Sequence, residues 1–247
     1  MIWRMILSFA LSLIPVSGWA AIASDATSGG SIEGNTTLDL SHTATGTSTD
    51  GFMACGIATS TGGGTTVSSV TWDPAGVNQA FTQITTIHLT DVRVDLWYLK
   101  APTAGAAKTV RIITSAGVNH AAICKTWTGV DQTTSIGTAV STSGTTSPSS
   151  LTPGSAVGDV VMDVIGWSSN AVTETIGAGQ TVIDSKRTTT TGGQLSVTGS
   201  EEAGSAGTST MSWTYSGTIN RGHIAVAIKA PASTATCRPR NLLGVGC

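Results

Sequence analysis

The chain has 247 residues, which is enough for one large all-β domain or two smaller ones. Charged residues make up 11% of the chain, against about 25% in an average soluble domain, and the net charge is −2. A nucleic-acid-binding protein should carry a basic patch, and the sequence contains no cluster of Lys or Arg. Thr, Ser, Gly and Asn must therefore cover most of the surface, as they do on exported β-sandwiches, adhesins and virion proteins.

The first 23 residues have the layout of a secretory signal peptide. Arg4 precedes an apolar run from Met5 to Val16, and Ala21-Ile22-Ala23 offers an A-x-A cleavage site, with Gly18-Trp19-Ala20 as an alternative. A transmembrane helix needs about 20 apolar residues, whereas this run is shorter and contains a proline. We therefore expect a secreted mature chain that begins near Ser24 and has no membrane span. The alternative is an uncleaved interfacial anchor.

Alternation of apolar and polar residues with a period of two predicts about ten to twelve β-strands and no helix in the mature chain. The stretch 92–132 is the clearest case. It predicts an antiparallel meander of three strands at 92–99, 109–114 and 120–128, with a turn at Ser115-Ala116-Gly117. Residues 159–167 are almost continuously apolar, which is typical of a strand covered on both sides.

These features predict an all-β fold, a two-sheet antiparallel β-sandwich that is jelly-roll-like. We expect the sandwich to span residues 36–231, after a flexible N-terminal segment at 24–35 and before a linker and Cys-bounded tail at 232–247. The small residues Ala54, Gly56 and Ala58 should let a second layer approach their strand closely.

An even number of cysteines in a secreted chain suggests disulfides, and four cysteines allow three pairings. Cys237 and Cys247 bracket a short tail and are predicted to pair with each other, the rival being an intermolecular bridge through Cys247. Cys55 and Cys124 each lie in a predicted strand. They either bridge across the sandwich or remain buried free thiols.

Six segments together resemble a known kind of domain. They are DLWYLKAPTAG, WTGVDQTTSIG, GDVVMDV, IGAGQT, and MSWTYSG followed by AVAIKAP. The pattern resembles an uncharacterised jelly-roll-like β-sandwich domain family of secreted bacterial and phage proteins, and covers most of residues 36–231. LWYL-x-x-P and GVDQTT are its most specific parts. The resemblance implies a jelly-roll-like fold and an extracellular or virion-surface setting, and it implies no catalytic residue.

No local motif for metal binding or nucleophilic catalysis is present. The four histidines, His42, His88, His120 and His223, show neither H-x-H nor H-E-x-x-H spacing, so we expect each at a strand end or partly exposed. The chain also lacks G-x-S-x-G and C-x-x-C. Loop calcium ligated by Asp50, Asp73 or Asp131 has no support from their spacing. We predict no metal and no cofactor.

Carboxylates give no clear catalytic pair. Glu201 and Glu202 are adjacent and would face opposite ways in an extended chain, whereas a glycosidase needs two carboxylates about 5–10 Å apart across a cleft. The other candidates, which are scattered along the strands, are Asp95, Asp159, Asp163, Glu174 and Asp184. Only folding could bring these together, and the same holds for a Ser-His-Asp triad. We therefore expect no enzymatic activity.

Tryptophan offers a different hypothesis, because aromatic rings stack on the faces of sugars. Trp72, Trp97 and Trp167 are the candidates for an exposed carbohydrate-binding platform, and core packing is the alternative for each. Trp127 and Trp213 are expected to pack in the core.

The sequence thus favours a non-catalytic exported module with a structural or adhesive role at a surface. We expect such a module to belong to an assembly such as a virion, a filament or a cell-surface layer. Its partners would be glycans or other surface proteins, including further copies of itself. The alternatives are a carbohydrate-binding module and a hydrolase whose site is assembled from distant loops.

Overall fold

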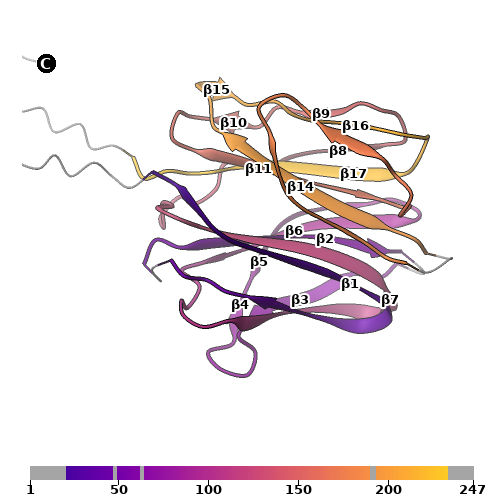
Figure 1. Cartoon of the computed structure of the whole chain (residues 1–247), viewed down its shortest axis with the longest axis horizontal. Coiled ribbons are helices and arrows are strands. Elements are labelled where there is room, and N and C mark those ends of the chain that lie inside the picture. Colours follow the sequence, from indigo (N-terminus) through magenta and orange to yellow (C-terminus); the bar gives the residue numbers. More distant parts are fainter. Residues whose placement is uncertain (1–20, 47–48, 62–63, 190–192, 233–247) are drawn as a thin grey trace, which may run out of the picture.

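The structure is a computed structural model, and it describes residues 21–46, 49–61, 64–189 and 193–232. In this part of the chain every regular element is a β-strand and every strand pairing is antiparallel (Figure 1). The all-β antiparallel sandwich expected from the sequence is confirmed. The strands number more than the ten to twelve expected, because several have only two or three residues and show no periodicity.

The first seven strands form one sheet, sheet A, in the order β4-β3-β7-β2-β6-β5, with β1 on the free side of β7. Their bounds are β1 Ala23–His42, β2 Phe52–Ser60, β3 Val67–Trp72, β4 Gln79–Ala80, β5 Thr82–His88, β6 Val92–Lys100 and β7 Lys108–Thr128. The first half of β7 pairs with β3 and the second half with β2. Sheet A therefore curls over on itself (Figure 1). An apolar cluster that includes Trp72, Ile112 and Trp97 fills the interior of this curl.

The remaining strands pack against the other face of β2, β6 and β7, the face that points away from the interior of the curl. Their bounds are β8 Val140–Gly144, β9 Ser149–Leu151, β10 Gly154–Ser155, β11 Val160–Trp167, β12 Glu174–Ile176, β13 Thr181–Arg187, β14 Ser196–Ala203, β15 Gly207–Thr208, β16 Met211–Tyr215 and β17 Arg221–Ile228. Sheet B has the order β13-β14-β11-β17-β8, sheet C the order β12-β16-β9, and β10 pairs with β15. Sheet C covers the face of sheet B that points away from sheet A, with Trp167, Trp213 and Tyr215 between them.

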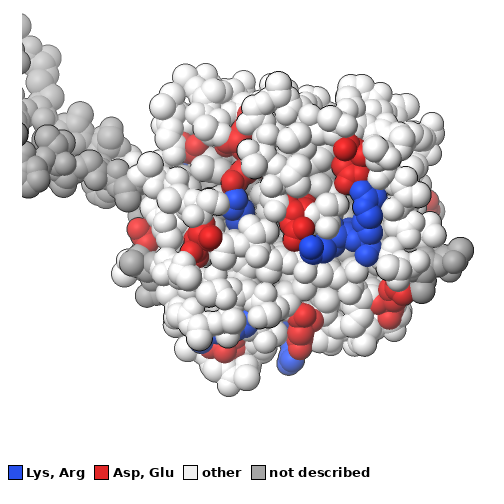
Figure 2. Space-filling view, in the orientation of Figure 1, with Lys and Arg blue, Asp and Glu red and all other residues white. Residues whose placement is uncertain are grey.

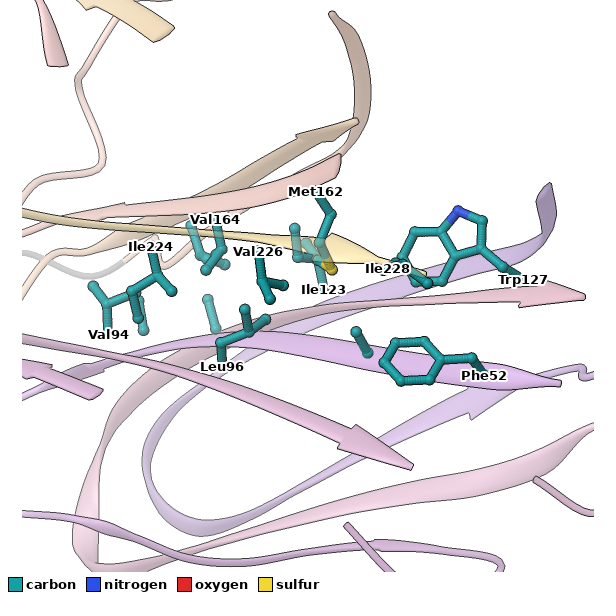
Figure 3. Close-up of a cluster of buried hydrophobic side chains, with 14 of the residues drawn as sticks. Phe52, Val94, Leu96, Ile123, Trp127, Met162, Val164, Ile224, Val226 and Ile228 are labelled. Atoms are coloured by element: carbon teal, nitrogen blue, oxygen red, sulfur yellow. The ribbon is translucent and has the colours of Figure 1, made fainter. Parts of the chain in front are cut away.

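Sheets A and B are the two packed sheets of the sandwich, and the largest apolar cluster lies between them (Figure 3). Leu96 and Ile123 point up from sheet A toward Val164 and Val226 of sheet B. The likeness to a jelly roll lies in these two antiparallel sheets. The path of the chain is simpler, because β1–β7 complete sheet A before β8 begins.

Residues 24–35 were expected to be flexible, and this prediction is wrong. They belong to β1, which runs antiparallel to β7 from Ala23 to His42. Their Gly, Ser and Thr residues carry no apolar period, so the pattern gave no strand signal there. Backbone pairing to β7 orders them instead, and the sandwich domain begins at β1 rather than at residue 36.

The meander expected at 92–132 is also wrong. β2 lies between β6 and β7, and residues 108–128 form a single strand. Gly117 lies where the β1–β7 ribbon bends and its register shifts. A Cβ on Gly117 would stand 3.0 Å from the carbonyl oxygen of Gly34, which itself has a φ of +62°. The glycines thus allow a sharp bend with pairing maintained, where the sequence indicated a chain reversal.

Cys55 and Cys124 form a disulfide. One of the two expectations was a disulfide that bridges across the sandwich, and the bond does not do so. The two cysteines are directly opposite one another on the neighbouring strands β2 and β7, with 4.1 Å between their Cα atoms, and both are buried inside the curl of sheet A. The predicted Cys237–Cys247 pair lies outside the described residues, as does most of the predicted signal peptide. No helix in the described part of the chain is long and apolar enough to cross a membrane.

The close approach predicted for the small residues of β2 is confirmed. Ala54 and Ala58 belong to the cluster between sheets A and B, and a Cβ added to Gly56 would stand 2.4 Å from Cγ2 of Val164 in sheet B.

We predict that Gly56→Ala lowers the free energy of unfolding by about 2 kcal/mol, because the added methyl group must push two well-packed sheets apart. Chemical denaturation measures this effect. Gly154→Ala is the matched control, since its Cβ would meet no atom closer than 3.8 Å, and it should change stability by less than about 0.5 kcal/mol. Equal effects at the two positions would contradict close packing at Gly56.

Candidate functional site

The layer between sheets B and C contains a cluster of buried polar side chains. Successive residues of a strand point to opposite faces. In β11 and β17, Val164 and Ile224 therefore point toward sheet A, while Asp163 and His223 point toward sheet C. The same alternation that fills the main core places a carboxylate and an imidazole in this second layer.

Ser149, His223 and Asp163 form a hydrogen-bonded chain. Ser149 Oγ lies 2.8 Å from His223 Nδ1, and His223 Nε2 lies 2.9 Å from Asp163 Oδ2. Ser149 is 1% exposed, and the other two residues are 0% exposed. Folding has thus assembled a Ser-His-Asp set from residues up to 74 positions apart, as the sequence alone left open.

This arrangement differs from a hydrolytic triad in two respects. In a hydrolytic triad the serine contacts Nε2 of the imidazole and the aspartate contacts Nδ1. Here the two nitrogens have exchanged roles. A substrate would also have to reach the serine oxygen, and this oxygen is sealed between two sheets. In this geometry the three residues cross-link sheets B and C.

Asp163 is the centre of a wider network. Besides His223, its carboxylate accepts hydrogen bonds from Trp213 Nε1 at 2.7 Å, from the Ser200 backbone N–H at 2.9 Å and from Ser200 Oγ at 2.7 Å. Gln180 Nε2 donates in turn to Ser200 Oγ at 2.6 Å. The buried charge is thus stabilised by donors from three strands, which is the usual requirement for a carboxylate removed from water.

The tryptophans predicted as a carbohydrate-binding platform are buried. Trp72 and Trp167 are 0% exposed and Trp97 is 9% exposed. Trp72 lies within the curl of sheet A and donates from Nε1 to the carbonyl oxygen of Thr103 at 3.1 Å. The sequence could not reveal this, because the strands that cover these rings come from distant segments. Trp127 and Trp213 are buried as expected.

Glu201 and Glu202 face opposite ways, as expected. Glu201 pairs with Lys125 and accepts a hydrogen bond from Trp127 Nε1 at 2.8 Å. Glu202 lines a shallow surface hollow of about 490 Å³ together with Gly179, Ser205 and Thr210. Partial burial raises the pKa of the Glu202 carboxyl above its usual range. None of the residues that line this hollow supplies the second carboxylate that glycoside hydrolysis requires.

No three His, Cys, Asp or Glu side chains in the described residues lie together as metal ligands. Of the aspartates considered for calcium, Asp73 pairs with Lys108, and Asp131 Oδ1 accepts from the backbone N–H groups of Thr133 and Thr134. These carboxylates stabilise turns and a strand end.

Each histidine was expected at a strand end or partly exposed. His42 is at a strand end, as expected, although it is buried, whereas His120 and His223 are buried within β7 and β17 and contradict the expectation. His42 ends β1, where Nδ1 lies 2.7 Å from Ser28 Oγ and Nε2 lies 2.6 Å from Thr126 Oγ1. Burial lowers the pKa of His42 to about 4, although the negative charge of Asp25 opposes the shift. Burial also lowers the pKa of His120.

We predict that stability falls between pH 6.5 and pH 4 because of His42. Above pH 6.5 the imidazole is neutral in both states. As the pH falls toward 4, the unfolded chain binds a proton that the folded protein does not, so the free energy of unfolding drops by about 3 kcal/mol. Urea denaturation at a series of pH values should therefore give a flatter profile for His42→Gln than for the native protein. His88→Gln, at an exposed position, should keep the native slope, and an unchanged slope in His42→Gln would refute the prediction.

No protein-family model, no curated protein and no solved structure matches this chain.

Proposed function

We propose that this chain is a non-catalytic exported module with a structural or adhesive role in a surface assembly, such as a virion, filament or cell-surface layer. The observation that carries the proposal is a pair of open strand edges on one side of the sandwich. Within the described residues, β5 pairs with β6 alone and β8 pairs with β17 alone, and these two edge strands lie next to each other. Unpaired edges of this kind are templates for pairing with a further strand.

The side chains along these edges suit contact with other surfaces. Exposed residues of β5 and β8 are mostly Thr and Ser, as Thr82, Thr86, Ser141 and Ser143 illustrate. Neither strand contains Lys, Arg, Asp or Glu. The face in Figure 2, which lies over β1 and β14 on the other side of the molecule, also has few charged groups, and its basic side chains mostly lie against acidic ones. A surface of hydroxyl groups with little net charge allows backbone pairing between copies without strong repulsion.

The burial of the side chains that could act in catalysis or sugar binding supports the non-catalytic part of the proposal. The Ser149–His223–Asp163 chain and all five tryptophans of the described residues are buried. What this protein presents to its surroundings is therefore strand edges and small polar side chains. A partner could be a second copy of the chain or another surface protein.

Self-association of the mature chain tests the proposal. Native mass spectrometry and sedimentation across a concentration series should show oligomers. Ser141→Lys/Ser143→Lys should weaken association by about tenfold or more, because charges on an edge strand oppose pairing. Ala75→Lys/Val77→Lys adds the same charge in an exposed turn and should associate normally. A chain that stays monomeric and binds no surface protein would contradict the proposal.

The non-catalytic part has its own test. A fluorophosphonate probe, which labels activated serines, should leave the folded protein unlabelled. Labelling at Ser149 that is lost in His223→Gln would instead establish a hydrolase.

A further inference from the structure

Arg221 is a buried arginine without a carboxylate partner. It begins β17 and is 5% exposed. Seven other Lys and Arg side chains of the described residues pair with Asp or Glu: Arg93, Lys108, Arg111, Lys125, Lys186, Arg187 and Lys229. Within the same part of the chain no Asp or Glu forms such a pair with Arg221. A buried guanidinium whose charge is not offset is costly, so this position requires an explanation.

One nitrogen of the Arg221 guanidinium is buried and has no hydrogen-bond partner. Its Nε donates to the Tyr215 hydroxyl oxygen at 2.8 Å, and its guanidinium carbon lies 5.9 Å from the centre of the Tyr215 ring. The Tyr215 hydroxyl is itself used, since it donates to the carbonyl oxygen of Thr146 at 2.5 Å. Nη1 of Arg221 is shut off from solvent and has no hydrogen-bond partner.

A second unsatisfied donor lies beside it. Trp167 is the residue directly opposite Arg221 on the neighbouring strand β11, so the two side chains share a face of sheet B. Trp167 Nε1 is likewise buried and has no hydrogen-bond partner. The Trp167 ring lies 5.9 Å from the same Tyr215 ring that Arg221 contacts. Two buried N–H donors, one of them cationic, therefore flank one aromatic ring.

We propose that Arg221 and Trp167 bind a small monovalent anion of the halide type between sheets B and C. Such an ion accepts hydrogen bonds from both N–H groups and offsets the guanidinium charge. A water molecule would satisfy the donors and leave the charge uncompensated. Because both donor atoms are enclosed, we expect a small spherical anion here rather than a phosphate or a larger organic acid. The site is independent of the proposed surface role and would stabilise the fold in chloride-containing surroundings.

Bromide provides the probe. Crystals of the native chain soaked in sodium bromide should give an anomalous peak within hydrogen-bonding distance of Arg221 Nη1 and Trp167 Nε1. In solution, replacement of sodium gluconate by sodium bromide at constant ionic strength should raise the unfolding midpoint and then saturate, as expected for a ligand that binds only the folded state.

Variants separate this site from a general salt effect. Trp167→Phe removes one donor and retains Arg221, and it should weaken the apparent bromide affinity by about tenfold. Trp97→Phe is the matched control, because the Trp97 Nε1 is also buried without a partner but lies within sheet A. It should leave the bromide dependence unchanged. Arg221→Met should abolish the dependence if it folds.

Three results would overturn the proposal. One is a water molecule with no anomalous peak at the site. Another is stabilisation that does not saturate or that is equal in Trp167→Phe. The third is a peak without any stabilisation, which would indicate an adventitious ion only.

Discussion

Asp163→Ala is expected to lower the free energy of unfolding by about 4 kcal/mol, one of the two largest effects predicted for a single site in this protein. The substitution removes the acceptor for Trp213 Nε1, His223 Nε2 and both donors of Ser200. These groups remain buried between sheets B and C, where water cannot replace the lost partner without opening the layer. Urea denaturation monitored by circular dichroism measures the loss.

Two further variants identify the cause. Asp163→Asn keeps the shape, but one carboxylate oxygen becomes an NH₂ group that faces N–H donors, so most of the loss should remain. Asp39→Ala removes a carboxylate of a surface pair with Arg111, in which Asp39 is 44% exposed, and should cost less than about 1 kcal/mol. A loss at Asp163 no larger than that at Asp39 would show that the buried network contributes little to stability.

The sequence contained part of this network. In the apolar run at 159–167, Asp163 is a carboxylate on a strand predicted to be covered on both sides, so it had to find buried partners. His223 begins a similar run on β17. Nothing in the sequence marked Ser149, because β9 has only three residues and no period. The sequence therefore predicted the strands that carry Asp163 and His223, but it did not predict sheet C, which completes the cluster.

The tryptophans illustrate the same limit. Period-two alternation correctly placed Trp97 and Trp167 on strands, yet their exposure depended on what covers each face. Trp167 is covered by sheet C, whose strands are three to five residues long. Trp97 is covered because sheet A curls at Gly34 and Gly117. The sequence indicated a turn at Gly117 and a flexible segment at Gly34. Alternation identifies two faces of a strand but not which one remains in water.

The second large effect concerns the disulfide. Removal of Cys55–Cys124 by Cys55→Ala/Cys124→Ala should lower the free energy of unfolding by about 4 kcal/mol, because the bond closes a loop with a sequence separation of 69 residues and restricts the unfolded chain. Native strand pairing should survive, since Cys55 and Cys124 are neighbours in an intact ladder between β2 and β7. Chemical denaturation of oxidised protein, compared with the double variant, measures the difference.

Cys237→Ala/Cys247→Ala is the natural control, since the predicted bond there closes a short loop outside the described residues. Its loss should leave the stability of the sandwich nearly unchanged, because a local loop restricts few of the contacts that define the fold. Non-reducing peptide mapping must first recover Cys55 linked to Cys124. If Cys55 were instead linked to Cys237 or Cys247, the register of β2 against β7 would be wrong, because that register places the two sulfurs face to face. The stability difference between the two double variants thus tests where the chain is cross-linked and how much of the unfolded ensemble the bond restrains.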